Sequence, residues 1–388
     1  MTNLELPRKL RRNFELGPIR PPSEAYSLLI RATRNCPWNR CRFCTIYKGS
    51  KFELRPVEDV VKDIEAAEDI SDGIKEMAGQ TGYAGGVREL AAVICRQGRF
   101  GPRVGNVALW LWRGGKSVFL QDSNTIIMRT PDLVKVLTCL RSTFPGVDRV
   151  TSYGRSHTAA RKSPAELREL KDAGLDRVHI GLETGSDALL AYVDKGCTSR
   201  QHIEGGRKVR EAGLSLCEYV MPGLGGKKMS AEHATETARV LNEIDPAYIR
   251  LRSLYVYPPM GLWDKVQDGE FEMLTEDEVV EELGVFIEKL QVTSYLKSDH
   301  ILNLLMEIEG KLPEDKQRCL DIIGRYLSLP YQERLNFQLG RRAGYYGSLG
   351  DLEDSERRQK VDEAMRRVNA GGHSTVEEAV HRLKHGFI

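Results

Sequence analysis

The sequence predicts an α/β fold, chiefly because two kinds of segment alternate along it. Between about residues 26 and 257, short apolar runs of β-strand composition are separated by longer segments with helical periodicity. This alternation is typical of parallel strands joined by helices. Because such crossovers are right-handed, the strands form either an open, doubly wound sheet or a curved, incomplete barrel.

Six strands are expected, with helices between them. The strands are Tyr26–Ala32, Ser117–Gln121, Arg149–Tyr153, Arg177–Gly181, Ser215–Met221 and Tyr248–Tyr255. The helices are Val57–Ala67, Pro131–Thr143, Pro164–Ala173, Asp187–Val193, Ser199–Ala212 and Ala231–Ile244. Ser163 before Pro164, with Glu166 three residues later, indicates a capping box. Gly174 and Gly213 stand where left-handed helix ends are expected.

Two segments depart from this alternation. Residues 69–116 are expected to be an insertion before the second strand, with Trp110 and Trp112 packing in the core. From about residue 258 the chain is expected to be helical, at Glu276–Leu290, Asp299–Ile308, Glu314–Leu327, Ser355–Val368 and Thr375–Lys384. Residues 331–346, rich in aromatic and basic side chains, are expected to be a loop. It is either a solvated connection or a lid over a substrate.

The composition narrows the class of protein. The 388 residues are 41% hydrophobic and 29% charged, and the formal net charge is only +2, so no strong field favours nucleic acid or acidic membranes. Apolar runs are too short to cross a bilayer, and the N-terminus has no signal-peptide core. The chain is therefore predicted to be cytoplasmic. Its scattered cysteines are expected to be thiols: Cys95, Cys139, Cys197, Cys217 and Cys319.

Three further cysteines, Cys36, Cys41 and Cys44, lie within nine residues in the pattern C-x4-C-x2-C. Three thiolates cannot all pair as disulfides, but they can hold three corners of an iron–sulfur cluster and leave one iron open. A structural zinc site would need a fourth ligand, which His157 or His179 could supply only through a coincidence of the fold. The three cysteines follow the first strand, at the edge where α/β folds bind ligands.

An α/β chain with a three-cysteine loop after its first strand resembles the radical S-adenosylmethionine (SAM) superfamily. Over roughly residues 25–260 it is most similar to the branch of oxygen-independent coproporphyrinogen oxidase and the elongator-type proteins. The resemblance implies that Cys36, Cys41 and Cys44 hold an oxygen-sensitive [4Fe–4S] cluster, with Phe43 matching the aromatic residue before the last cysteine. The usual spacing is C-x3-C-x2-C, and this chain has one residue more between the first two cysteines.

The resemblance also implies a fold and a domain organisation. The fold would be an incomplete (β/α)6 TIM-type barrel with a helical C-terminal extension. Residues 1–24 would be an N-terminal arm, and residues 25–260 the core barrel with the 69–116 insertion. Residues 261–388 would be a helical region that serves as a substrate or partner element.

Residues at the ends of later strands would then bind SAM. Asp122 and Ser123 end the second strand, where the family receives the SAM amino group. Tyr153 or Arg155, at the end of the third strand, would supply a polar contact. For Arg155 a solvated surface position is the alternative.

Three charged residues complete the implied SAM site. Glu183, in the run from Gly181 to Ser186, would accept hydrogen bonds from the ribose, unless it is an ordinary salt-bridge carboxylate. Lys195 would pair with the SAM carboxylate, and a solvated lysine is the alternative. Glu218 lies in an otherwise apolar strand, where an unpaired carboxylate is costly, so a ligand or charge partner is favoured.

The implied function is that of an enzyme. The cluster would reductively cleave SAM to a 5′-deoxyadenosyl radical, which abstracts hydrogen from a small-molecule substrate. An electron donor such as flavodoxin or ferredoxin would be a partner, and neither a membrane nor a nucleic acid is expected. The alternatives are a non-catalytic carrier of heme or another cofactor, and an RNA-modifying enzyme, which the mixed charge of the C-terminal third disfavours.

Overall fold

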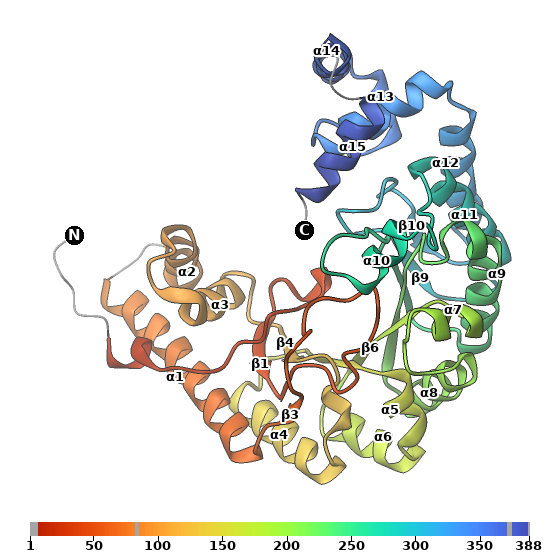
Figure 1. The fold of residues 1–388 in the computed structure, drawn as a ribbon. Helices are drawn as coiled ribbons and strands as arrows, with labels where there is room; N and C mark the ends of the chain where they lie inside the picture. The colour runs from red at the N-terminus through yellow and green to blue at the C-terminus, as the bar shows by residue number, and fades with distance from the viewer. Residues whose placement is uncertain (1–6, 82–84, 371–374, 387–388) are drawn as a thin grey trace. The chain divides into compact units, whose positions relative to one another are not determined.

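The computed structural model describes residues 7–81, 85–370 and 375–386, which form two compact units (Figure 1). The first contains the described residues up to Asn39 together with Ile46–Ile180 and Glu204–Leu216. The second contains Arg40–Thr45, Gly181–Ile203 and the described residues from Cys217 onward.

The first unit contains a parallel sheet. Its strands are β1 (Leu28–Arg31), β4 (Ser117–Gln121), β5 (Arg149–Gly154) and the first part of β6 (Arg177–Glu183), hydrogen-bonded in that order. The connecting elements are α1 (Val57–Thr81), α2 (Gly86–Gln97), α3 (Gly101–Trp112), α4 (Thr130–Thr143), α5 (Ser156–Arg161) and α6 (Pro164–Asp172), with short 3-10 helices at Arg8–Arg11, Pro22–Glu24 and Thr125–Ile127. Two-residue strands β2 (Thr33–Arg34) and β3 (Glu53–Leu54) pair antiparallel.

In the second unit, β7 (Ser215–Val220), β8 (Tyr248–Leu251) and β9 (Tyr295–Lys297) are parallel, and β10 (Glu309–Lys311) runs antiparallel to β9. Its helices are α7 (Asp187–Tyr192), the start of α8 (Ser199–Glu211), α9 (Gly226–Ile244), α10 (Gly261–Gln267), α11 (Glu276–Lys289), α12 (Lys316–Ser328), α13 (Tyr331–Arg342), α14 (Ser355–Ala370) and α15 (Val376–His385), with a 3-10 turn at Leu349–Glu353. The predicted α/β fold of parallel strands alternating with helices is therefore confirmed.

The predicted local signals at helix ends are also confirmed. Ser163 and Glu166 form a reciprocal capping box at the start of α6. Gly174 and Gly213 adopt positive φ angles of 108° and 79°, which a residue with a Cβ rarely adopts. Trp110 is buried and packs edge-on against Phe144, with ring centroids 5.3 Å apart, so its assignment to the core is also correct. The same prediction for Trp112 is wrong, because its side chain is only half-buried and lies against the Arg113 guanidinium.

The predicted end of the first helix at Ala67 is wrong, because α1 continues to Thr81. Its apolar face continues through Ile70 and Ile74, which are fully buried and one helical turn apart. The 69–116 segment is thus the rest of α1 together with α2 and α3, which Figure 1 shows lying beside it.

Two predictions for the C-terminal third are wrong. The region after residue 258 is not wholly helical, since it contains β9 and β10, and Asp299–Ile308 forms no helix. The Asn303 side chain accepts from the Ser253 backbone N–H (2.9 Å) and donates to the Leu251 carbonyl (2.9 Å), while Asp299 pairs with Arg250. Such side-chain bonds to nearby backbone and charged groups compete with helix formation.

The prediction of a loop at residues 331–346 is also wrong. Most of this segment is helix α13, which Pro330 precedes. Its apolar residues Leu335, Phe337 and Leu339 are buried. Four of its polar side chains are buried as well, and their composition concealed a core helix: Asn336, Gln338, Arg341 and Arg342. Across the residues that the structure describes, no helix is long and apolar enough to cross a membrane.

Candidate cofactor site

An ion pair lies at the carboxyl end of β6 in the second unit. Lys195 Nζ is 2.9 Å from Glu183 Oε1, and each side chain is 12% exposed. Burial favours the neutral amine of Lys195, but the negative charges of Glu183, Cys41 and Cys197 outweigh it and raise the pKa of Lys195. The sequence assigned Glu183 and Lys195 to one site, and the structure brings them into direct contact.

Glu218, on β7, is fully buried beside this pair. Neither of its carboxyl oxygens has a hydrogen-bond partner among the described residues. Burial raises the pKa of Glu218 well above its ordinary value, and Glu183 adds to the rise while Lys195 opposes it. Two carboxyl groups therefore share one ammonium group, and the second carboxyl lacks the donors that a buried acid requires.

The backbone around Glu183 leaves room for this arrangement. Glu183 has a φ of +63°, an uncommon conformation for a residue other than glycine and one that recurs at functional sites. A Cβ at Gly181 would lie 2.2 Å from Glu183 Oε1 and 3.0 Å from Lys195 Nζ, so a side chain there would displace the pair. In the sequence Gly181 is only part of a motif. Its steric role depends on the Glu183–Lys195 pair, which the structure places against it.

The segment that carries Cys41 and Cys44 is seated in the same unit. The Arg42 N–H donates to the Val193 carbonyl (2.9 Å), and the Arg42 carbonyl accepts from the Leu262 N–H (2.9 Å). Phe43 is buried in an apolar cluster, against which Cys41 and Cys44 pack: Leu189, Val193, Leu224, Val256, Met260, Leu262 and Phe271. Lys195 Nζ lies 5.4 Å from the centroid of the Phe43 ring.

The first unit holds Cys36 and its neighbourhood. The Asn39 N–H points at Cys36 Sγ (3.4 Å), a donor that a thiolate would accept. Asp122 is buried, with its Oδ2 2.5 Å from Arg31 Nη2 and 3.2 Å from the Asn35 N–H. Burial raises the pKa of Asp122 despite the Arg31 charge. Arg31 is thus an internal partner for the carboxylate that the sequence assigned to the SAM amine.

The remaining predicted residues of the first unit surround this loop. The Ser123 hydroxyl donates to the Asn35 carbonyl (2.9 Å). The Arg155 guanidinium lies 5.3 Å from the centre of the Trp38 ring, and Tyr153 packs edge-on against Phe119. Arg155 is therefore tied to the cysteine segment through Trp38 rather than being a freely solvated side chain.

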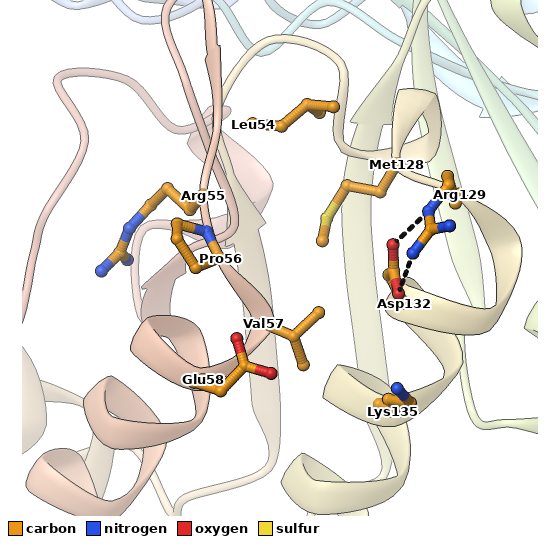
Figure 2. Close-up of a pocket in the computed structure, with 9 residues that line it drawn as sticks. All are labelled: Leu54, Arg55, Pro56, Val57, Glu58, Met128, Arg129, Asp132 and Lys135. Atoms are coloured by element: carbon orange, nitrogen blue, oxygen red, sulfur yellow. Dashed lines mark hydrogen bonds and ion pairs between the residues drawn. The ribbon is translucent and has the colours of Figure 1, made fainter.

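A pocket in the first unit lies apart from these residues, near the starts of α1 and α4 (Figure 2). Its lining is Leu54, Arg55, Pro56, Val57, Glu58, Met128, Arg129, Asp132 and Lys135. Arg129 pairs with Asp132 (2.7 Å), and Figure 2 shows Arg55 pointing away from them. Arg55 pairs instead with Asp63 (2.6 Å). No predicted site residue lines this pocket, so it is not the candidate site.

The donors present suit the implied cofactors. Cys36, Cys41 and Cys44 are half-buried cysteines that form no disulfide, and cysteine thiolates are the ligand type of iron–sulfur clusters. The unpartnered oxygens of Glu218 suit a ligand rich in hydroxyl donors, as a ribose is. Cys36 belongs to the first unit and the other two cysteines to the second. Among the described residues no three His, Cys, Asp or Glu side chains form a preformed metal site, so the ligand set stays a prediction.

Comparison with known families identifies the class of protein. Residues 114–238 match the Radical SAM superfamily. Over this segment the resemblance to the radical SAM superfamily is confirmed, and enzymes of that superfamily use a [4Fe–4S] cluster and SAM. The match includes Glu183, Lys195 and Glu218, whereas the three cysteines lie outside it.

Individual relatives are distant. The chain is 33% identical over 99 residues to biotin synthase of Desulforudis audaxviator, covering 25% of this chain and 28% of that protein. It is 21% identical over 178 residues to the heme chaperone HemW of Bacillus subtilis, covering 45% and 46%. The chain thus spans less than half the length of both. Coproporphyrinogen III oxidase (HemN) of Escherichia coli aligns in structure with a TM-score of 0.43 and 13% identity, covering 72% of this chain and 54% of that one.

Proposed function

We propose that this protein is a radical SAM enzyme in which Cys36, Cys41 and Cys44 hold a [4Fe–4S] cluster. The observation that carries the proposal is the group of Glu183, Lys195 and Glu218, which lies within the segment that matches the superfamily. Its surplus, unpartnered carboxyl group is what a bound SAM would complete. When bound, cluster and SAM supply a one-electron cleavage of SAM that leads to hydrogen abstraction from the substrate.

The chain's own residues would bind and orient SAM. Lys195 presents a buried, permanently charged ammonium group to a carboxylate, and Glu183 and Glu218 present oxygens to ribose hydroxyls. The apolar cluster around Phe43 limits the access of water to the segment that carries Cys41 and Cys44. Asp122, Ser123, Tyr153 and Arg155 remain proposed SAM contacts.

The test is anaerobic reconstitution with iron and sulfide, followed by dithionite and SAM. We expect brown absorbance near ~400 nm, a property of the cluster itself, and formation of 5′-deoxyadenosine. Cys41→Ala should lose both, whereas Cys139→Ala, a change at a half-buried cysteine outside the motif, should keep both. A cluster-replete protein that forms no 5′-deoxyadenosine would refute the enzyme, and unchanged absorbance in Cys41→Ala would refute the ligand assignment.

The reaction would need an electron donor such as flavodoxin or ferredoxin, and a small-molecule substrate. The second candidate function is a heme or cofactor carrier, which the similarity to the heme chaperone HemW favours. Titration with hemin separates the two functions. Stoichiometric heme binding without 5′-deoxyadenosine would support the carrier, and 5′-deoxyadenosine without heme binding would support the enzyme.

A further inference from the structure

Arg341, near the end of α13, is a buried cation that forms no ion pair with a carboxylate of the described residues. The residue is 5% exposed, and its Nε has no hydrogen-bond acceptor in the same part of the chain. Its Nη2 donates to the thioether of Met306, a weak acceptor. The nearby acid Glu307 is engaged elsewhere, since its Oε2 accepts the Leu349 N–H (3.1 Å).

The acid whose charge acts on Arg341, Glu276, is already shared by two other cations. Glu276, at the start of α11, lies 2.8 Å from Arg342 Nη2 and 3.0 Å from Lys384 Nζ. These contacts, against the cost of burial, lower the pKa of Glu276 to about 2, so the carboxylate is ionised at neutral pH. Three buried or nearly buried cations thus face one carboxylate.

Two further groups lie near the cluster of Glu276, Arg342 and Lys384, and neither of them adds negative charge. Arg252 follows the last residue of β8, at the carboxyl end of the strand, where its N–H donates to the Val220 carbonyl (2.9 Å). His300 lies near both Arg252 and Arg342, and burial together with these two charges lowers its pKa to about 4. At neutral pH His300 is therefore uncharged, and the excess of cations is not compensated from this side.

A buried charge without a partner is costly, and a buried guanidinium is suited to bidentate contact with a carboxylate or a phosphate. We propose that Arg341 binds an oxyanion group, a carboxylate or a phosphate, on the substrate. In assigning the anion to the substrate, the inference rests on the proposed function.

The test measures thermal unfolding of the full chain with reconstituted cluster. Inorganic phosphate and glutarate are each titrated against sodium chloride at equal ionic strength. At least one of them should raise the unfolding midpoint of the wild type. Arg341→Met should raise the midpoint without anion, because an uncompensated buried charge is gone, and should weaken anion binding about tenfold or more. Arg341→Lys, which keeps the charge, should retain part of the binding.

Arg325→Met is the matched control, because Arg325 is an exposed arginine paired with Glu353 on the surface, and it should leave anion binding unchanged. Stabilisation by phosphate alone would identify a phosphorylated substrate, and by glutarate alone a carboxylate. The proposal is overturned if neither anion stabilises the wild type, or if Arg341→Met and Arg325→Met bind the anion equally well. It is also overturned if Arg341→Met is less stable than the wild type without anion. None of these readouts requires SAM cleavage, so they are independent of the proposed reaction.

Discussion

Two buried charge clusters of the second unit are out of balance in opposite directions. At β6 and β7, Glu183 and Glu218 share the single cation Lys195. At α11, α13 and α15, Glu276 is shared by Arg342 and Lys384, and Arg341 forms no ion pair with an acid of the described residues. Buried groups that satisfy each other indicate a structural role, whereas a buried polar or charged group left without a partner indicates a missing ligand. The first cluster therefore calls for hydrogen-bond donors and the second for an anion.

The largest expected effect comes from removing the shared acid of the cationic cluster. Glu276→Gln leaves Arg342 and Lys384 without a partner and should lower the free energy of unfolding by about 3–5 kcal/mol. Because the pKa of Glu276 is lowered, its contribution is present above the unfolded pKa and is lost as the pH falls toward about 2. Urea unfolding at pH 7 and pH 3 measures this. Glu353→Gln, which removes the acid of the exposed pair with Arg325, is the control. An equally large loss of unfolding free energy in this variant would contradict the comparison.

The next effect comes from removing the shared cation of the acidic cluster. Lys195→Met leaves two buried carboxyl groups side by side and should cost about 2–3 kcal/mol, somewhat less than a fully buried pair because both partners are slightly exposed. It should also abolish SAM binding measured by equilibrium dialysis. Lys162→Met offers a control, because Lys162 is a buried lysine whose partner Glu166 is held by its own capping box. Undiminished SAM binding in Lys195→Met would exclude Lys195 from the site.

A smaller effect is expected from filling the space beside the acidic cluster. In Gly181→Ala the new Cβ meets Glu183 Oε1, so the pair must move, at a cost of about 1–3 kcal/mol. SAM affinity should fall together with stability. Gly324→Ala on α12 is the control, because a Cβ there meets no neighbour and a helix interior favours alanine. If Gly181→Ala binds SAM as the wild type does, the pair does not contact the ligand.

At pH 5 the smallest effect comes from neutralising the leftover acid, and this effect grows as the pH rises. The pKa of Glu218 is raised on folding, so the folded protein holds a proton that the unfolded chain releases, and stability falls as the pH rises above about 4.5. Glu218→Gln should remove this loss, gaining up to about 1.4 kcal/mol per pH unit over that range. Unfolding at pH 5 and pH 8 measures the difference. A gain that does not grow with pH would mean that Glu218 is already ionised and paired.

Local patterns predicted most of the fold, because they depend on neighbours in the chain. The six strands and the caps at Ser163 and Gly174 were read from such patterns. The helix predicted at Asp299–Ile308 failed because Asn303 bonds to Ser253, 50 residues earlier in the chain. Helix α13 was missed because its polar side chains find buried partners such as Glu276, which no local pattern reveals.

The candidate site was likewise predictable from local motifs but not in its long-range contacts. A motif assigned Glu183 and Lys195 correctly to one place, and the apolar strand around Glu218 indicated an unusual carboxyl group. No local pattern predicted that Arg31 would pair with Asp122, or that Arg341 would be buried with its Nε unsatisfied by any described residue, because both depend on which distant side chains meet.

The seating of Arg40–Thr45 has a consequence for how the protein would acquire its cofactor. The backbone of Arg42 is held on both sides by hydrogen bonds, and Phe43 is anchored in an apolar cluster, so this half of the cysteine loop is ordered by the polypeptide alone. Little conformational entropy remains to be lost there when metal arrives. After oxidative damage, the protein would therefore be repaired by reloading iron and sulfide rather than by refolding.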